Sequence, residues 1–302
     1  MIKERWQIGA FTVTKVVELE RSSENGRPGS TLPDARPDLV KEIDWLHPHF
    51  VTDEGWLKTS IHALLVETPD IRLIVDTCAG NDKDRHLPQF NRLSTTFLDS
   101  LANLGWTRES VDAVLCTHLH VDHVGWNTML VDGEWVPTFP RARYFFAEEE
   151  YRYWLASLEC EAGLDGLTAE TLDLMDNRAV FLDSVKPIVD AGLVAMVETD
   201  AVVAPGVSLM PTPGHTPGHV SIVLESEGER AIITGDMMHH PCQIARPQWS
   251  SGFDSHPHIS EETRQTFLSQ FVDSPTLVIG THFTSPTAGW IVRDDTGYRL
   301  KF

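Results

Sequence analysis

Hydrophobic and polar residues alternate in short runs along the first half of the chain, and this pattern is typical of β-strands. Between the runs, Phe97, Leu98, Leu101 and Leu104 share one face of a predicted helix over Thr95–Leu104, which ends at Gly105. A strand follows directly, so the order β-α-β predicts a layered α/β fold with a right-handed crossover. The strands predicted here are Phe11–Leu19, Ile61–Glu67, Ile71–Asp76 and Val111–Thr117.

The second half of the chain repeats this order of elements without repeating the sequence. A helix is predicted over Glu261–Val272, and the chain closes with a hairpin over Trp290–Lys301 whose turn is 294–297. No linker separates two domains. The strands predicted here are Val202–Met210, His219–Glu225, Arg230–Thr234 and Thr276–Ile279.

Composition and charge limit the class of protein. The 302 residues are 41% hydrophobic and 23% charged, which is ordinary for a folded globular chain. A net charge of −20, from 24 basic and 44 acidic residues, repels polyanions and disfavours a nucleic-acid partner. No apolar run reaches signal-peptide or membrane-span length, so we expect a cytoplasmic protein without a membrane partner. The four cysteines form no C-x-x-C pair and are expected to be reduced, packed thiols.

Four candidate metal ligands fall within six residues at the end of the strand over 111–116. They are His118, His120, Asp122 and His123, in the pattern H-x-H-x-D-H. Imidazoles two residues apart can point to one side of an extended segment, and the aspartate and histidine that follow can reach a neighbouring point. The motif therefore supplies parts of two adjacent metal sites.

Three further candidates each follow a predicted strand. His215 stands in the sequence PTPGHTPGH, Asp236 follows IITG, and His282 follows VIGT. Loops at strand ends are where α/β folds gather their functional residues. We expect His219, just inside the next strand, to support the ligands by hydrogen bonds or to pack in the core rather than to bind metal. Asp76, at the end of its own strand, is expected to hydrogen-bond the loop that carries the ligands.

With these motifs in this order, the sequence resembles the metallo-β-lactamase fold superfamily from the first strands to the C-terminus. The resemblance implies an αββα sandwich of two mixed β-sheets flanked by helices, and two divalent metal ions. Zn²⁺ is the expected ion, although Mn²⁺, Co²⁺ and Fe²⁺ accept the same ligands. It further implies one metal on His118, His120 and His215, and the other on Asp122, His123 and His282, with Asp236 as the bridge.

The resemblance also organises the rest of the chain. We expect a single domain over 1–302, with an N-terminal loop extension at about 22–58 and a mostly helical insertion at about 126–196, both covering the site. The extension is rich in Pro, Gly, Asp and His, and long loops of this kind are often functional. Aromatic residues in these segments either line an apolar pocket or pack in the core.

Asp236 narrows the choice among the branches of the superfamily. The true β-lactamases lack a bridging carboxylate, so its presence argues against β-lactam hydrolysis. The segment 235–240, with Gln243 and Phe253-Asp254 after it, resembles the branch of methyl parathion hydrolase and related lactonases and esterases. Quorum-quenching lactonases usually carry Tyr three residues after the bridging Asp, where this chain has His239, which disfavours acyl-homoserine lactones.

The expected enzyme is a dinuclear metallohydrolase of the lactonase or esterase type (EC 3.1), in which a hydroxide bridging the two metals cleaves a small, largely uncharged lactone or carboxylic ester. Asp122 is the expected proton shuttle, and His239 either hydrogen-bonds the substrate oxygen or supports the site structurally. Two alternatives stay open: a phosphotriesterase (organophosphate hydrolase) with the same site, and an iron-dependent redox enzyme such as a thiol dioxygenase. The expected partner is a small-molecule substrate, and a homodimer would follow the commonest symmetry.

Overall fold

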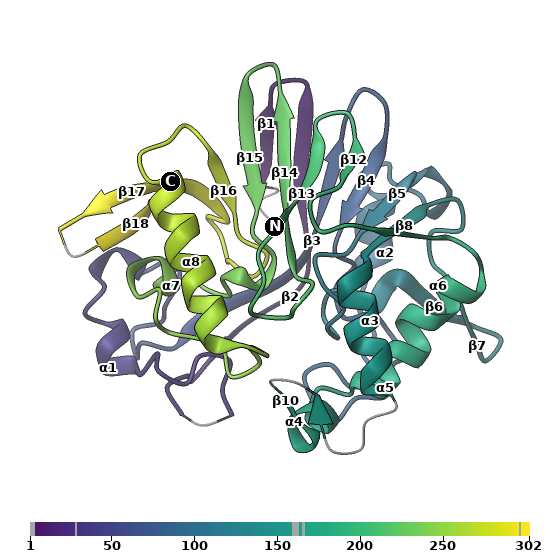
Figure 1. Ribbon diagram of the computed structural model, residues 1–302, viewed down its shortest axis with the longest axis horizontal. Helices are drawn as coiled ribbons and strands as arrows, with labels where there is room; N and C mark the ends of the chain where they lie inside the picture. The colour runs from purple at the N-terminus through teal and green to yellow at the C-terminus, as the bar shows by residue number, and fades with distance from the viewer. Residues whose placement is uncertain (1–3, 28, 159–162, 165–166, 296) are drawn as a thin grey trace. The chain divides into compact units, whose positions relative to one another are not determined.

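The computed structural model describes residues 4–27, 29–158, 163–164, 167–295 and 297–302, and these residues form two compact units (Figure 1). Unit 1 comprises Met1–Glu18 and Ile61–Thr199, and unit 2 comprises Leu19–Ser60 and Asp200–Phe302. Two of the three boundaries fall inside long strands, β2 (Phe11–Ser23) and β3 (Leu57–Glu67). The single domain that the sequence predicts stays a prediction.

Unit 1 is built on a mixed sheet in which, among the described residues, the strands run in the order β1-β2-β3-β4-β5-β8-β11. β3 is antiparallel to β4, whereas β4, β5, β8 and β11 are parallel neighbours. The carboxyl ends of these four strands therefore meet at one edge of the sheet. The remaining bounds are β1 (Arg5–Ile8), β4 (Arg72–Val75), β5 (Ala113–Leu115), β8 (Arg143–Ala147) and β11 (Val194–Val197).

The segment 126–196 is less helical than the sequence predicts. It opens with the hairpin of β6 (Thr128–Val131) and β7 (Glu134–Pro137) and supplies β8 and β11 to the sheet. A short strand rich in aromatic residues contains too few residues for its hydrophobic period to be distinguished from that of a helix. Its helices, and those before it, are α2 (Phe97–Ala102), η2 (Arg108–Ser110), η3 (Gly125–Asn127), α3 (Glu148–Ser157), α4 (Ala169–Leu174), α5 (Asn177–Val180), η4 (Phe181–Val185) and α6 (Lys186–Asp190), with the small strands β9 (Gly163–Leu164) and β10 (Leu167–Thr168).

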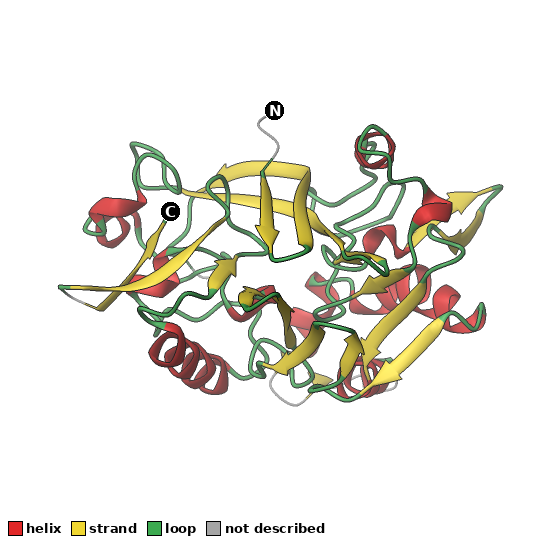
Figure 2. Cartoon of the chain, turned by 90° about the horizontal axis from the view of Figure 1, so that it is seen from above, coloured by secondary structure: helices red, strands yellow, loops and turns green. Residues whose placement is uncertain are grey.

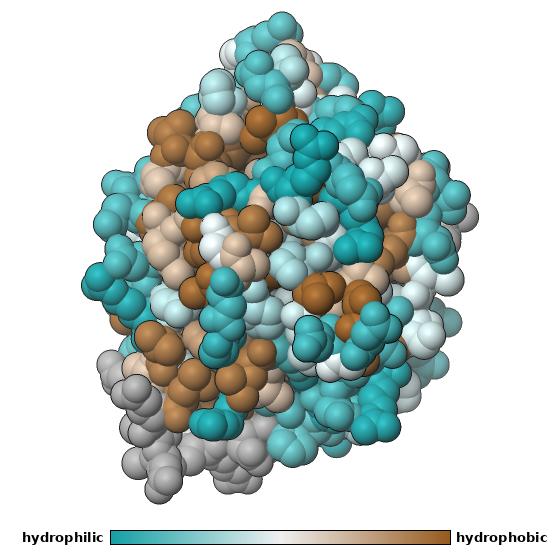
Figure 3. Space-filling view, turned by 90° about the vertical axis from the view of Figure 1, so that its right-hand side faces the viewer, coloured by the Kyte–Doolittle hydropathy of each residue, from teal (hydrophilic) through white to brown (hydrophobic). Residues whose placement is uncertain are grey.

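A buried ion cluster fixes these helices to the preceding loop. Arg85 makes two hydrogen bonds to the carboxylate of Asp183, at 2.7 and 2.8 Å, and Lys83 lies 3.4 Å from the same group. Burial lowers the pKa of Lys83 to about 8, and the Asp183 charge opposes that shift. The outer face of this region carries hydrophobic side chains among polar ones (Figure 3).

Unit 2 carries the second mixed sheet, which runs in sequence order from β12 to β18 in the described part of the chain. β15 and β16 are parallel, and the other neighbouring strands of this sheet are antiparallel. Figure 2 shows strands and helices alternating with long loops. The bounds are β12 (Val202–Ala204), β13 (Val207–Pro211), β14 (Val220–Ser226), β15 (Glu229–Ile233), β16 (Leu277–Ile279), β17 (Ala288–Asp294), β18 (Gly297–Lys301), η5 (Gly235–Met237), α7 (Cys242–Ala245) and α8 (Pro257–Phe271). The predicted terminal hairpin is confirmed by β17 and β18, although Thr296 of its turn lies outside the described residues.

The predicted loop at 22–58 contributes to the core of unit 2. Its described residues include the end of β2, the short helices α1 (Pro37–Val40) and η1 (Asp44–Leu46), and the start of β3. Its hydrophobic side chains, including Leu46 and Phe50, are buried in one cluster with Phe267 and Leu268 of α8. Burying a large apolar side chain stabilises a fold by about 1.5–3 kcal/mol, so this loop is part of the folded unit.

The described cysteines are buried, and the described helices are short. Cys78, Cys116 and Cys242 are buried free thiols, as predicted, and Cys160 lies outside the described residues. No helix in the described ranges is both long and apolar enough to cross a membrane.

His240 joins the 22–58 loop to the loop after β15. Its Nε2 lies 2.9 Å from the carbonyl oxygen of Phe50, and its Nδ1 accepts a hydrogen bond from the backbone N–H of Cys242 at 3.1 Å. The ring is therefore neutral, with its proton on Nε2. Burial lowers the pKa of His240 to about 4.

Acid should therefore weaken the folded state through His240. Because the folded pKa lies below the ordinary value near 6.5, this contribution to stability is complete above pH 6.5 and is lost as the pH falls towards 4, by about 3 kcal/mol. In urea unfolding between pH 7 and 4, His240→Gln should lose less stability than the unaltered protein. His258→Gln, at an exposed position, is the control and should behave as the unaltered protein. Equal acid losses in His240→Gln and the unaltered protein would contradict the assignment.

Candidate metal centre

The sheet of unit 2 brings three predicted ligands to one edge. β13 and β15 are each antiparallel to β14, and β15 is parallel to β16, so all three strands end at the same edge. His215, Asp236 and His282 follow these strand ends. The prediction that each of them lies just beyond a strand is confirmed.

The two carboxylate oxygens of Asp236 face different histidines. Oδ1 lies 3.0 Å from Nε2 of His282, and Oδ2 lies 3.5 Å from Nε2 of His215. The backbone N–H of Asp236 donates a hydrogen bond to Nε2 of His219 at 2.8 Å, so His219 supports this loop as predicted. One buried carboxylate therefore contacts two imidazoles through separate oxygens.

His239 lies at the same carboxylate. Its Nε2 is 3.2 Å from Oδ2 of Asp236, and its ring stacks on that of His282 and meets that of His215 edge to face. Burial lowers the pKa of His239, and the Asp236 charge opposes that shift. Among the described residues, Nδ1 of this ring has no hydrogen-bond partner. His239 is thus a buried imidazole in contact with the carboxylate of Asp236.

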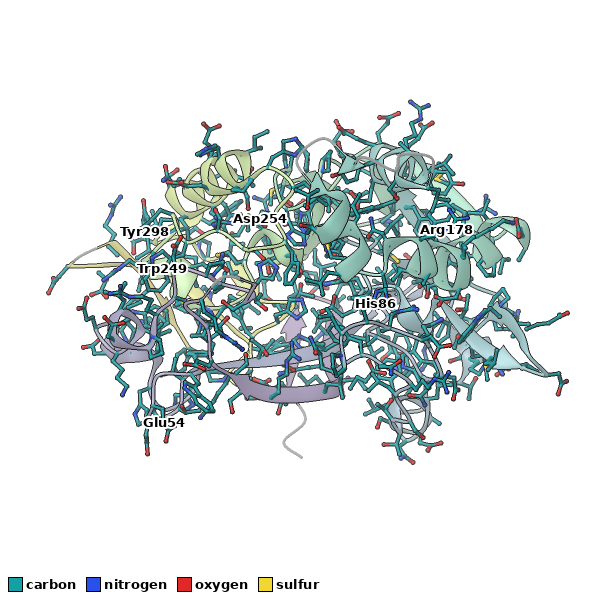
Figure 4. All side chains as sticks on the ribbon, turned by 90° about the horizontal axis from the view of Figure 1, so that it is seen from below. Glu54, His86, Arg178, Trp249, Asp254 and Tyr298 are labelled. Atoms are coloured by element: carbon teal, nitrogen blue, oxygen red, sulfur yellow. The ribbon has the colours of Figure 1, made fainter. Side chains whose placement is uncertain are left out.

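A second buried carboxylate orients His215. Oδ1 of Asp254 lies 2.8 Å from Nδ1 of His215, and Oδ2 accepts the backbone N–H of Ser251. Arg264 of α8, fully buried, places its guanidinium 3.7 Å from the same carboxylate. Burial raises the pKa of Asp254, but the hydrogen bond from His215 and the charge of Arg264 outweigh it, so the net shift is downward. Asp254 is labelled among the side chains of unit 2 in Figure 4.

The H-x-H-x-D-H motif forms the matching cluster of unit 1. Nε2 of His118 lies 2.9 Å from Nδ1 of His120, and the rings of His118 and His123 are 4.0 Å apart. Nε2 of His123 is 3.7 Å from Oδ1 of Asp122. The three imidazoles are buried, and Asp122 is half-buried.

Asp76, at the end of β4, supports this motif. Its carboxylate accepts the backbone N–H of Thr117 at 2.8 Å and the Thr117 hydroxyl at 2.9 Å, and it lies 2.9 Å from Nδ1 of His123. β4 and β5 are parallel neighbours, so the end of β4 lies beside the motif. The predicted structural role of Asp76 is confirmed.

Four of the site histidines share one orientation, and His120 differs because its Nδ1 faces Nε2 of His118. In His123, His215 and His282, Nδ1 is held by Asp76, Asp254 and the carbonyl oxygen of Ser60, respectively, whereas Nε2 faces an aspartate of the cluster. His118 follows the same rule, with Nδ1 on Thr117. An imidazole whose Nδ1–H is fixed in this way presents the Nε2 lone pair, which is the arrangement of metal-binding histidines.

Each unit therefore holds its own set of predicted site residues. Unit 1 has His118, His120, Asp122 and His123, and unit 2 has His215, Asp236, His239 and His282. Asp254 is among the residues that carry the resemblance to the methyl parathion hydrolase branch, but no local pattern indicates its supporting role, because it lies 39 residues from His215. Imidazole and carboxylate donors together suit Zn²⁺ and other divalent transition metals, so the residues fit such an ion.

Fold and donor set define an α/β protein of the metallohydrolase class. Residues 57–282 match the model of the metallo-β-lactamase superfamily, and the chain belongs to this superfamily. The predicted fold class, mixed sheets with helices in the metallo-β-lactamase fold, is confirmed.

Lactonases are among its relatives. An N-acyl homoserine lactonase from Bacillus sp is 27% identical over 165 residues, and this match spans 54% of the present chain and 53% of that protein. The crystal structure of AbOPH, a hydrolase of the β-lactamase superfamily, has a TM-score of 0.80 at 25% identity and covers 99% of this chain and 96% of its own. AidC, a dizinc quorum-quenching lactonase, has the same fold, with a TM-score of 0.75 at 20% identity and coverage of 99% and 96%.

Removing the Asp254 carboxylate should destabilise unit 2. Asp254→Ala leaves Arg264 buried without its counter-charge, which typically costs about 3–5 kcal/mol. Asp38→Ala is the control, because Asp38 pairs with Arg36 on the surface, where such pairs contribute about 0–1 kcal/mol. Urea unfolding measures both changes. A loss below about 1 kcal/mol for Asp254→Ala would mean that Arg264 is satisfied by its other hydrogen bonds.

Proposed function

We propose that this protein is a dinuclear metal-dependent hydrolase of a small, largely uncharged lactone or carboxylic ester. The observation that carries the proposal is the contact of Asp236 with His215 through one oxygen and with His282 through the other. A carboxylate with this division of contacts suits a bridge between two ions.

The proposed ligand assignment is the one that the family resemblance implies, and each ion takes residues from both sets. His118, His120 and His215 would hold one ion, and Asp122, His123 and His282 the other, with Asp236 shared. Zn²⁺ is the proposed ion, and the relative AidC is described as a dizinc lactonase. The fixed Nδ1 atoms of His123, His215 and His282 support this assignment, because such partners typically raise metal affinity 10–100-fold.

Two divalent ions, when bound, would lower the pKa of water to near neutrality and polarise the oxygen of the bond to be cleaved. The chain's own residues then move protons and orient the substrate. Asp122, half-buried beside His123, is the proposed proton shuttle to the leaving oxygen. His239, buried and with Nδ1 unengaged by the described residues, is the proposed hydrogen-bond partner of the substrate oxygen.

Charge and relatives favour the substrate class. A net charge of −20 disfavours polyanionic substrates, and an N-acyl homoserine lactonase is among the relatives of the chain. His239, where such lactonases usually carry Tyr, favours a lactone or ester other than an acyl-homoserine lactone. A phosphotriester would use the same residues, so substrate preference separates these candidates.

Elemental analysis of the purified protein should give about two divalent ions per chain, with zinc the main metal. The same preparation should hydrolyse a γ- or δ-lactone or an aryl ester faster than a phosphotriester, and a chelator should abolish hydrolysis until metal is restored. Asp236→Asn is the matched variant, and it should lower both metal content and turnover.

Preference for the phosphotriester would move the assignment to organophosphate hydrolysis. A single iron with oxygen-dependent activity and no hydrolysis would indicate a redox enzyme.

Replacing His239 distinguishes its two roles. If this imidazole hydrogen-bonds the substrate oxygen, His239→Ala should lower kcat by about 100-fold or more while leaving metal content unchanged. Loss of metal in this variant would instead make His239 a structural support of Asp236, which it contacts at 3.2 Å. His258→Ala, at an exposed position of unit 2, controls for the loss of an imidazole and should retain full activity.

A further inference from the structure

The backbone between His118 and His120 lies outside the hydrogen-bond ladder of the sheet. β5 ends at Leu115, and the segment that follows is irregular and buried, with Leu119 only 3% exposed. A buried N–H group without a partner costs about 1–3 kcal/mol, so the donors of this segment require acceptors. The side chains that accept them also determine where the two imidazoles stand.

Glu150 accepts the N–H that lies between the two histidines. Its Oε1 is 3.0 Å from the backbone nitrogen of Leu119, and the side chain is buried, with 1% of the residue exposed. Glu150 stands in the first turn of α3, directly after β8. A hydrogen bond to an ionised carboxylate is roughly twice as strong as one to a neutral acceptor.

The same oxygen of Glu150 also fixes an aromatic ring beside the motif. The indole Nε1–H of Trp154, one helical turn later in α3, donates to Oε1 at 2.5 Å. The ring of Trp154 lies 5.1 Å from that of His120, and Trp154 is buried. Glu150 therefore holds both the backbone between the two histidines and the indole ring of Trp154, which lies beside His120.

Strand order explains why this carboxylate is available. β5 lies between β4 and β8, and all three are parallel (Figure 1). Asp76 at the end of β4 accepts the N–H of Thr117, and Glu150 beyond the end of β8 accepts that of Leu119. Two carboxylates that are not themselves predicted ligands thus hold the backbone on either side of His118, one from each neighbouring strand.

We propose that Glu150 is a positioning residue for His118 and His120, and that it sets the affinity of the metal held by this pair. Leu119 lies between the two histidines that are proposed to hold the same ion, whereas Asp76 also contacts His123, a proposed ligand of the other ion. Loss of Glu150 should therefore act mainly on one of the two metal-binding steps. This inference rests on the proposed dinuclear function.

The test is stepwise metal binding in Glu150→Ala and Glu150→Gln, measured on the full chain by Zn²⁺ competition with a coloured chelator. Glu150→Ala should weaken one binding step by about 10–100-fold and leave the other unchanged. Glu150→Gln, which keeps the volume and one acceptor oxygen, should weaken the same step less. In the Co²⁺-loaded protein the visible absorption band should change in Glu150→Ala.

Glu149→Ala is the matched control, because Glu149 is the preceding residue of α3 and is exposed. It should bind both ions as the unaltered protein does. Wild-type affinity for both ions and an unchanged Co²⁺ spectrum in both Glu150 variants would overturn the proposal. Equal weakening of both steps together with a lower unfolding midpoint would also overturn it, because that result marks a general structural role.

Failure of the proposed function gives a different result. The metal titrations use no substrate, so a protein that binds two ions and hydrolyses no member of the substrate panel removes the hydrolase assignment and leaves the role of Glu150 intact. If Glu150→Ala does not fold, the near-isosteric Glu150→Gln decides the question by the same two readouts. An unaltered protein that does not bind two ions would refute both proposals.

Discussion

Buried carboxylates are the constraint on which the candidate site depends. Asp76, Glu150, Asp236 and Asp254 are all nearly inaccessible to solvent. Removing a carboxylate from water costs several kcal/mol unless it is paired or accepts hydrogen bonds, so each of these groups must have fixed donors around it. Asp76, Glu150 and Asp254 accept hydrogen bonds from backbone N–H groups, and histidine Nδ1–H groups, the Thr117 hydroxyl and the Trp154 indole are their further donors. A polar site built in this way is rigid, because moving any one member leaves a buried charge unsatisfied.

Sheet topology places three of these carboxylates, because Asp76, Glu150 and Asp236 follow the ends of β4, β8 and β15. In unit 1, the parallel strands β4, β5 and β8 end at one edge, and in unit 2 the same holds for β13, β15 and β16. Backbone N–H and C=O groups beyond the end of a strand are no longer paired within the sheet, so they need other hydrogen-bond partners. The residues that satisfy them are therefore the residues that also hold the histidines.

This topology explains what the sequence could and could not predict. The predicted ligands follow strands with clear hydrophobic patterns, so their positions at strand ends could be read from local sequence. Glu150 and Asp254 stand 31 and 39 residues from their partners Leu119 and His215, and no local pattern encodes such a contact. The strands within 126–147 were missed for a related reason, since short runs of aromatic and β-branched residues fit either helix or strand. Asp176, at a positive φ of 57° between α4 and α5, interrupts a helix that periodicity alone would have continued.

The orientation of the histidines adds an argument that residue identity alone does not supply. A histidine that merely fills a core can use either ring nitrogen for its hydrogen bond. Here His118, His123, His215 and His282 all use Nδ1 for a supporting contact outside the cluster and turn Nε2 inward. Four side chains with one orientation are expected if each presents the Nε2 lone pair to a cation. Without a cation, the lone pairs of His123, His215 and His282 would face the carboxylate oxygens of Asp122 and Asp236, and these acceptors would repel one another. The supporting partners are Thr117 beside the motif, Asp76 after β4, Asp254 in the loop before α8 and Ser60 near the start of β3. The requirement for this orientation therefore extends well beyond the ligands themselves.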